Sequence, residues 1–286
     1  MTTERIGAQL RALLLACVLG CPITAAAQAD APSADAPDRP QAFGPRTSWF
    51  TVRGRDPATV ARALGLSGLT PASWASGLAA ATARPGPAPA EATVFLSPPV
   101  DGWIFVVSSS LPYPDHRPAR SDAEAEIDRR FDHVFTALAV RFPDVQFFGS
   151  YRVVGFRAWA RARGARIERI FAYAGGEVLA NVGEQTGEER ALRFPDIGGM
   201  TIEAAREALN TRLAQRERRE EQLLADGLDR AAVEQALRDE GRAPIPGEDD
   251  TLALAGAWSI NPATLEARDL APASGYTALL PPDLRQ

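Results

Sequence analysis

Residues 151–163, YRVVGFRAWARAR, carry groups that could bind a ligand at alternate positions. The alternation predicts a strand, so Arg157, Trp159, Arg161 and Arg163 share one face. Guanidinium groups beside an indole can hold an acidic or aromatic partner through bidentate hydrogen bonds and cation–π contacts. We favour the other interpretation, a solvated sheet face whose arginines pair with glutamates. Arg157, Trp159 and Arg161 are nevertheless the candidate binding residues.

Carboxylates are the second candidate chemistry, because a pair of them can supply the acid and the base for glycoside cleavage. Four lie on or beside expected strands: Asp101, Glu168, Glu177 and Glu184. Charged residues usually lie at exposed turns and edges, where they add solubility. This set is therefore a weak indication of catalysis, and no catalytic residue is assigned.

Metal, cofactor and triad chemistry have little support. The two histidines, His116 and His133, each follow an aspartate, but neither has a second ligand at helical spacing. A zinc site needs three or four convergent ligands. No GxSxG elbow surrounds the serines at 108–110, so a Ser-His-Asp triad is not indicated. We expect no metal and no cofactor.

The composition excludes further chemistries. All 31 basic residues are arginine, so a P-loop lysine, a pyridoxal Schiff base and a Ser-Lys dyad are impossible. Both cysteines, Cys17 and Cys21, lie in the first 29 residues, which leaves a cysteine-free chain after them. The net charge of −5 argues against a nucleic-acid partner, which would need a basic stripe.

Residues 1–29 have the pattern of a signal peptide. Arg5 and Arg11 precede an apolar run at 12–20, and Ala27-Gln28-Ala29 predicts cleavage before Asp30. The run is shorter than the roughly 20 residues that span a bilayer, and no later segment suits a transmembrane span. We expect a periplasmic or secreted protein. The minority alternative is a lipoprotein, because residues 18–21 resemble a lipobox ending at Cys21.

The stretch PPVDGWIFVV at 98–107 raises the question of whether Trp103 lines a pocket or belongs to a core. Asp101-Gly102 predicts a tight turn between strands at 93–96 and 103–107. Both faces of the second strand are apolar, which is typical of a strand covered on both sides. We therefore place Trp103 in the core of a central hairpin.

The remaining pattern predicts one α+β domain over residues 47–265, with a mostly antiparallel sheet and packed helices. Residues 30–46 are rich in Pro, Ala and Asp and are expected to be a disordered linker. Helices are expected from Asp56-Pro57, from Thr70-Pro71 and after Ser121. Strands follow from Val145 to Val182, and residues 266–286 are expected to be a loosely held C-terminal tail.

A charged segment at 201–243 predicts a helical-hairpin insertion, broken at Asp226-Gly227. The apolar positions Ile202, Ala205, Leu209 and Leu213 form a stripe that ends before Arg216. The first helix is therefore expected to dock at its start and to project into solvent further along.

The blocks PPVDGW, VQFFGSYRVV, NVGEQT and LAGAWSINP resemble those of an uncharacterised family of bacterial proteins, over approximately residues 47–196 and 249–265. The family has no activity to carry over, so the resemblance implies no catalytic residues. It does imply that the charged helical segment is an insertion into one domain.

The functional hypothesis is an exported, non-enzymatic binding or interaction protein of the cell envelope. Its partner is unknown: an envelope component or an exported toxin that it neutralises. The alternative is a carboxylate-dependent hydrolase acting on envelope glycans. Two carboxyl groups about 5 to 9.5 Å apart in a cleft would favour that alternative.

Overall fold

One antiparallel sheet of nine strands organises the part of the chain that the computed structural model describes, residues 36–83, 92–241 and 243–285. These residues all belong to one compact unit. The α+β class and the antiparallel sheet expected from the sequence are confirmed. In spatial order the strands are β2 (Thr70–Ala72), β9 (Gly275–Leu279), β3 (Thr93–Leu96), β4 (Trp103–Ser108), β1 (Ser48–Arg53), β5 (Asp144–Tyr151), β6 (Phe156–Arg163), β7 (Arg166–Ala174) and β8 (Glu177–Val182).

The β3–β4 hairpin lies near the middle of this sheet and buries Trp103. Asp101 and Gly102 form its turn with φ angles of 49° and 79°, which the glycine adopts without strain. Trp103, Phe105 and Val107 join the core on one face of the sheet, and Ile104 and Val106 join the core on the other. Trp103 is thus a core residue, as predicted.

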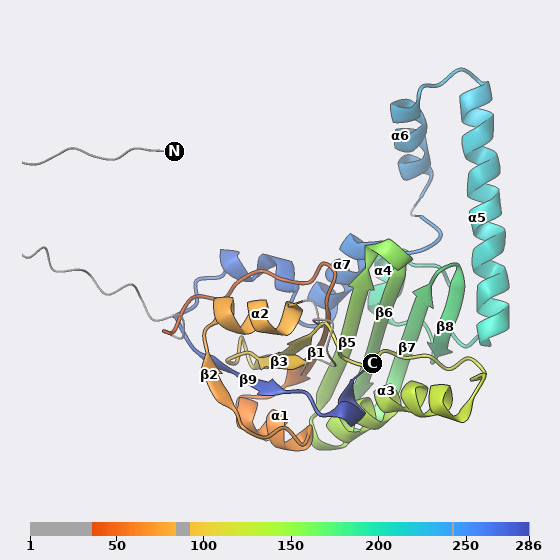
Figure 1. Cartoon of the computed structure of the whole chain (residues 1–286). Helices are drawn as coiled ribbons and strands as arrows, with labels where there is room; N and C mark the ends of the chain where they lie inside the picture. Colours follow the sequence, from red (N-terminus) through yellow and green to blue (C-terminus); the bar gives the residue numbers. More distant parts are fainter. Residues whose placement is uncertain (1–35, 84–91, 242, 286) are drawn as a thin grey trace, which may run out of the picture. The chain divides into compact units, whose positions relative to one another are not determined.

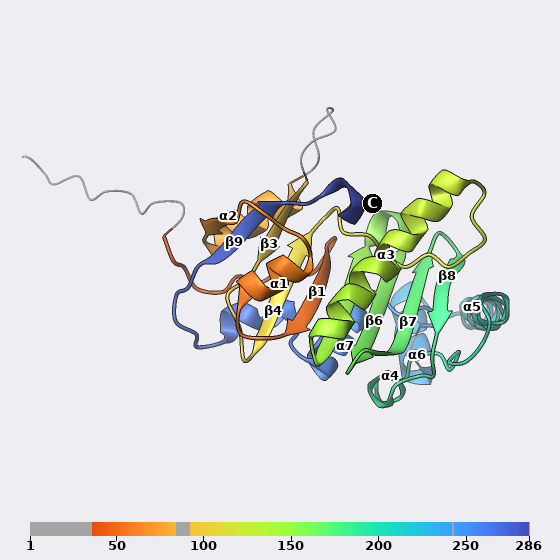
Figure 2. The same cartoon turned by 90° about the horizontal axis from the view of Figure 1, so that it is seen from below.

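Helices cover both faces of the sheet (Figures 1 and 2). On one face lie α1 (Pro57–Ala63) and α3 (Asp122–Arg141), whose apolar side chains share a core with that face. On the other lie α2 (Trp74–Thr82), α4 (Gly187–Ala191) and α7 (Glu248–Trp258). No helix in the described ranges combines the length and apolar character that a membrane crossing requires.

The small side chains of β6 face α3. Ala158, Ala160 and Ala162 share one core with Phe131 and Leu138 of that helix. Short side chains on a strand allow a helix to approach the sheet closely, which is the packing that the alternation in residues 151–163 predicts. The opposite face of β6 carries the arginines and Trp159.

The insertion is a helical hairpin of α5 (Ile202–Ala225) and α6 (Arg230–Glu240). Ala205 and Leu209, near the start of α5, are buried in the main core beside β8. Leu223 instead packs with Val233 and Leu237 in a separate cluster between the two helices. The outer part of α5 extends past the sheet (Figure 1), as its charge pattern predicts.

Two segments expected to lie outside the domain contribute to it. Residues 36–46 are not a disordered linker: Asp38 accepts hydrogen bonds from the backbone N–H groups of Trp74 and Ala75 at 2.6 and 2.9 Å, at the start of α2. The expected tail contains β9, which pairs with β2 and β3. Both segments are held by partners remote in sequence. The predicted signal peptide, with Cys17 and Cys21, lies outside the described residues.

The helix expected from Thr70-Pro71 begins later. Thr70–Ala72 form edge strand β2, where Pro71 is tolerated because an edge strand needs fewer backbone donors. Ser73 then caps α2 by accepting from the backbone N–H of Ser76 at 3.0 Å.

Candidate functional site

The predicted binding row on β6 is covered by other elements. Arg157, Trp159 and Arg161 are only 9%, 2% and 6% exposed. The Arg161 guanidinium donates to Asp144 at 2.8 Å and lies over the Trp258 ring of α7. The row is therefore not an open binding surface. The prediction that these arginines pair with acidic residues holds for Arg161. Helices rather than solvent, however, cover this face of β6.

Trp159 belongs to a buried polar network that fixes α4. Its Nε1 donates to Oε1 of Glu189 at 2.8 Å, and Arg169 Nε donates to the same oxygen at 3.0 Å. Arg169 also donates to Asn181 Oδ1 at 2.8 Å. Glu189 Oε2 accepts from the backbone N–H of Thr186, which completes a capping box. Because its groups satisfy one another, this network positions the chain rather than a ligand.

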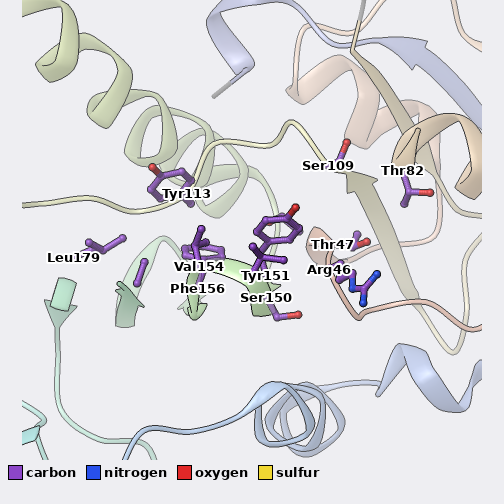
Figure 3. A pocket seen from close by; sticks show the side chains of 13 residues that line it. Arg46, Thr47, Thr82, Ser109, Tyr113, Ser150, Tyr151, Val154, Phe156 and Leu179 are labelled. Atoms are coloured by element: carbon purple, nitrogen blue, oxygen red, sulfur yellow. The ribbon is translucent and has the colours of Figure 1, made fainter. Parts of the chain in front are cut away.

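A groove of about 610 Å³ opens at the end of β5, beside the short 3₁₀ turn Arg152–Val154 (Figure 3). We call this cavity the groove. The residues that line it come from the start of β1, the ends of α2 and β5, the loop after β4, and β6 to β8. They are Arg46, Thr47, Ser48, Thr82, Ser109, Tyr113, Ser150, Tyr151, Val153, Val154, Phe156, Ala174 and Leu179.

One wall of the groove is apolar and incompletely covered. Val153 and Val154 are 78% and 51% exposed, and Tyr151 beside them is 41% exposed. Tyr113 and Phe156 form an aromatic pair with ring centroids 5.1 Å apart, and both rings lie on the same side of the groove in Figure 3. An exposed patch of neighbouring apolar side chains typically marks a binding surface.

The other wall carries hydroxyl groups and is tied to α7 through Glu248. Ser150 Oγ donates to Glu248 Oε1 at 3.0 Å, the backbone N–H of Arg46 donates to the same oxygen at 3.1 Å, and Arg152 Nη2 donates to Oε2 at 3.1 Å. Burial of Glu248 alone would raise its pKa, but these hydrogen bonds outweigh burial and lower it. Ionised Glu248 thus holds two lining residues of the groove, Arg46 and Ser150, through hydrogen bonds. The sequence does not single out Glu248, because a glutamate at the start of a helix is common.

The carboxylates considered for catalysis lie apart from the groove. Asp101 pairs with Arg268 in the β3–β4 turn, and Glu177 pairs with Arg206 of α5. Glu168 and Glu184 line a separate hollow of about 380 Å³. Glu168 is ion-paired there with Arg163 at 2.7 Å and with Arg166 at 3.4 Å.

The two histidines do not meet. His116 Nε2 lies 3.0 Å from Asp132 Oδ1 of α3, and its backbone N–H donates to the carbonyl of Leu179 at 2.8 Å. His133 is exposed on α3. In the described ranges, no three His, Cys, Asp or Glu side chains are grouped so that they could hold a metal ion.

The fold and groove define an α+β protein with a cavity lined mainly by hydroxyl and apolar groups. Comparison with protein-family models, with curated proteins and with solved structures found no match for the chain. The resemblance to an uncharacterised bacterial family therefore stays a prediction.

Proposed function

We propose that this chain is a non-enzymatic binding protein of the cell envelope, and that a segment of a partner protein occupies the groove. The partner is an envelope protein or an exported toxin that binding neutralises. The observation that carries the proposal is the exposed apolar turn at Val153 and Val154, set beside a wall of hydroxyl groups.

The lining of the groove suits a peptide segment. Hydroxyl groups both donate and accept hydrogen bonds, so the side chains of Thr47, Ser48 and Ser109 can pair with a backbone carbonyl or N–H. The apolar turn offers contacts for aliphatic side chains of the partner. The volume of about 610 Å³ falls in the usual range of ligand pockets, about 300 to 1,000 Å³.

The charges at the groove also favour binding over hydrolysis. None of the described residues that line it is Asp or Glu, and Arg46 is the charged residue among them. The nearby carboxylate of Glu248 already accepts three hydrogen bonds. A glycosidase needs one carboxyl group free to give a proton and a second to act as base or nucleophile.

The alternative, a hydrolase acting on envelope glycans, keeps one supporting observation: Glu168 and Glu184 line the same hollow. Both oxygens of Glu168 are already ion-paired, one with Arg163 and one with Arg166. Release of soluble fragments from purified envelope glycan, lost in both Glu168→Gln and Glu184→Gln, would establish the alternative.

A matched pair of valine substitutions tests the groove. Val153 is 78% exposed in the groove wall, and Val140 is 66% exposed on α3, away from the groove. Aspartate at position 153 should abolish retention of the partner from envelope extract, while Val140→Asp should retain it as the wild type does. Both variants should unfold at the wild-type temperature. Equal retention by the two variants would refute the groove as the binding site.

The envelope location has its own test. Intact-mass measurement of the protein from a periplasmic fraction should give a chain that begins at Asp30. A diacylated chain that begins at Cys21 would make the protein a lipoprotein. A full-length chain found in the cytoplasm would overturn the proposed location and leave the groove experiment unaffected.

A further inference from the structure

Four arginines line a hollow of about 290 Å³ between the helical hairpin and the segment that follows α4. Arg212, Arg216 and Arg219 come from α5, and Arg193 comes from the segment after α4. We call these four side chains the arginine hollow. Glu240 of α6 is the carboxylate among its described lining residues. The hollow shares no lining residue with the groove.

The clustering of these arginines does not stabilise α5. Positions 212, 216 and 219 are spaced by four and three residues, so their side chains lie on one face. Like charges at a spacing of four residues repel and weaken a helix. Arg193 adds a second unfavourable feature, because its φ of 58° lies in the left-handed region that residues other than glycine rarely adopt.

Two of the four arginines have partners. Arg219 donates from Nε and Nη2 to Oε1 of Glu240 at 2.8 and 2.6 Å, and Arg216 Nη1 donates to the carbonyl of Leu237 at 3.2 Å. Among the described residues, the guanidinium groups of Arg193 and Arg212 have neither a hydrogen bond nor an ion pair. Counted over its described lining residues, four arginines and Glu240 give the hollow an excess of three positive charges, in a chain whose net charge is −5.

We propose that the arginine hollow binds a phosphate group, held between Arg193 on the domain and Arg212 on the helical hairpin. A guanidinium group presents a planar fork of N–H donors that matches two phosphate oxygens, and several forks can surround one phosphate. The excess of positive charge favours a doubly charged phosphate over a single carboxylate. The volume of about 290 Å³ is large enough for a phosphate or a small headgroup.

This site gives the hairpin a role that packing alone does not. The base of α5 is anchored by Ala205 and Leu209, whereas the outer helices pack mainly on each other. A phosphate bound by Arg193 and Arg212 would join the outer hairpin to the domain through a ligand. Binding is therefore expected to protect backbone amides in residues 210–240 from hydrogen exchange.

The experiment uses isothermal titration calorimetry of the full chain with inorganic phosphate and pyrophosphate, at low ionic strength. Arg212→Gln and Arg193→Gln should each weaken binding by about tenfold or more, because each removes a charged fork. Arg206→Gln is the matched control: it lies on the same helix and pairs with Glu177 at 3.8 Å outside the hollow. This control should bind as the wild type does, and circular dichroism should show all three variants folded.

A second arm distinguishes the source of the phosphate. Sedimentation with vesicles of phosphatidylcholine containing phosphatidic acid should retain the protein if the phosphate belongs to a lipid headgroup. Binding of free phosphate without vesicle retention assigns a soluble phosphorylated ligand. If Arg206→Gln weakened phosphate binding as much as the other two variants, the binding would be a general attraction of anions. That result would overturn the proposed site. Absence of binding to phosphate, pyrophosphate and vesicles by the wild type would also overturn it.

Discussion

Arg169 Nε donates a hydrogen bond to Glu189 Oε1 at 3.0 Å, and both side chains are 1% exposed. The same carboxylate oxygen accepts from Trp159, so one glutamate of α4 joins β6 and β7 to the segment that follows β8. Removing one partner of a buried ion pair leaves an uncompensated charge. Loss of either side chain is therefore expected to destabilise this part of the fold.

The first prediction concerns this pair. Glu189→Ala should lower the free energy of unfolding by about 3 to 5 kcal/mol, because the Arg169 charge stays buried without its carboxylate. Urea unfolding followed by tryptophan fluorescence measures the change. The double variant Arg169→Met with Glu189→Leu should lose less than Glu189→Ala, since it leaves no buried charge. A loss below about 1 kcal/mol for Glu189→Ala would contradict the assignment.

Trp103 provides the second prediction. This residue is 7% exposed and belongs to the core, so Trp103→Ala should cost about 3 to 5 kcal/mol of unfolding free energy. Arg53, whose guanidinium lies 5.0 Å from the ring centroid, gives the control. Arg53→Ala should cost about 1 kcal/mol or less. If Trp103→Ala instead kept the wild-type melting temperature, the indole would not be a core group.

The third prediction divides the helical hairpin. Replacing residues 214–239 by a short Gly-Ser linker should leave the domain folded, because Leu223, Val233 and Leu237 pack in their own cluster and loop length costs little. Removing residues 201–243 should destabilise the domain, since it also takes Ala205 and Leu209 from the main core. Thermal melts of both deletions provide the measurement. Equal melting temperatures would show that the start of α5 does not support the sheet.

The fourth prediction concerns pH and His116. The hydrogen bond with Asp132 raises the pKa of His116, with burial opposing it and the charges of Asp132, Asp115 and Asp128 adding to it. Because the pKa is higher in the folded state, protonated His116 stabilises the fold. This stabilisation is complete below the unfolded-state pKa of about 6.5 and is lost as the pH rises through the folded-state pKa.

Asp132→Asn isolates this contribution. The wild type should exceed the variant in unfolding free energy by about 0.5 to 1 kcal/mol near pH 5.5. The difference should shrink as the pH rises through the folded-state pKa of His116, because the imidazole then loses its charge. Proton NMR of the imidazole signals should show a lower pKa for His116 in the variant. A difference independent of pH would mean that the pair contributes no charge-dependent stability.

Local patterns predicted the elements whose partners are near in sequence. Asp101-Gly102 predicted the β3–β4 hairpin, and the small side chains at Ala158 and Ala160 predicted the face of β6 that packs on a helix. The decline of apolar residues along α5 predicted where this helix leaves the core. Turn residues carry the information in the first case, and the period of the side chains carries it in the other two.

The sequence could not show which elements cover a face. Arg157 and Arg161 alternate with apolar residues as they would on a solvated strand, but α4 and α7, which come later in the chain, lie over Arg161. The groove was missed for a related reason: its hydroxyl residues come from segments as distant as Thr47 and Ser150. Asp38 was assigned to a spacer because a cap on a helix 36 residues away leaves no local signal.

The place of β9 has a consequence for the order in which the chain can fold. Residues 275–279 pair with β3 on one side and with β2 on the other. Both neighbours precede β9 by about 180 residues or more, so this end of the sheet closes only after nearly the whole chain is available. Contacts this distant slow folding. Until β9 arrives, the open edge of β3 can pair with other chains. Chaperone holding during synthesis would therefore protect Thr93–Leu96 more than any segment of the β5–β8 meander, whose strands pair with their immediate neighbours.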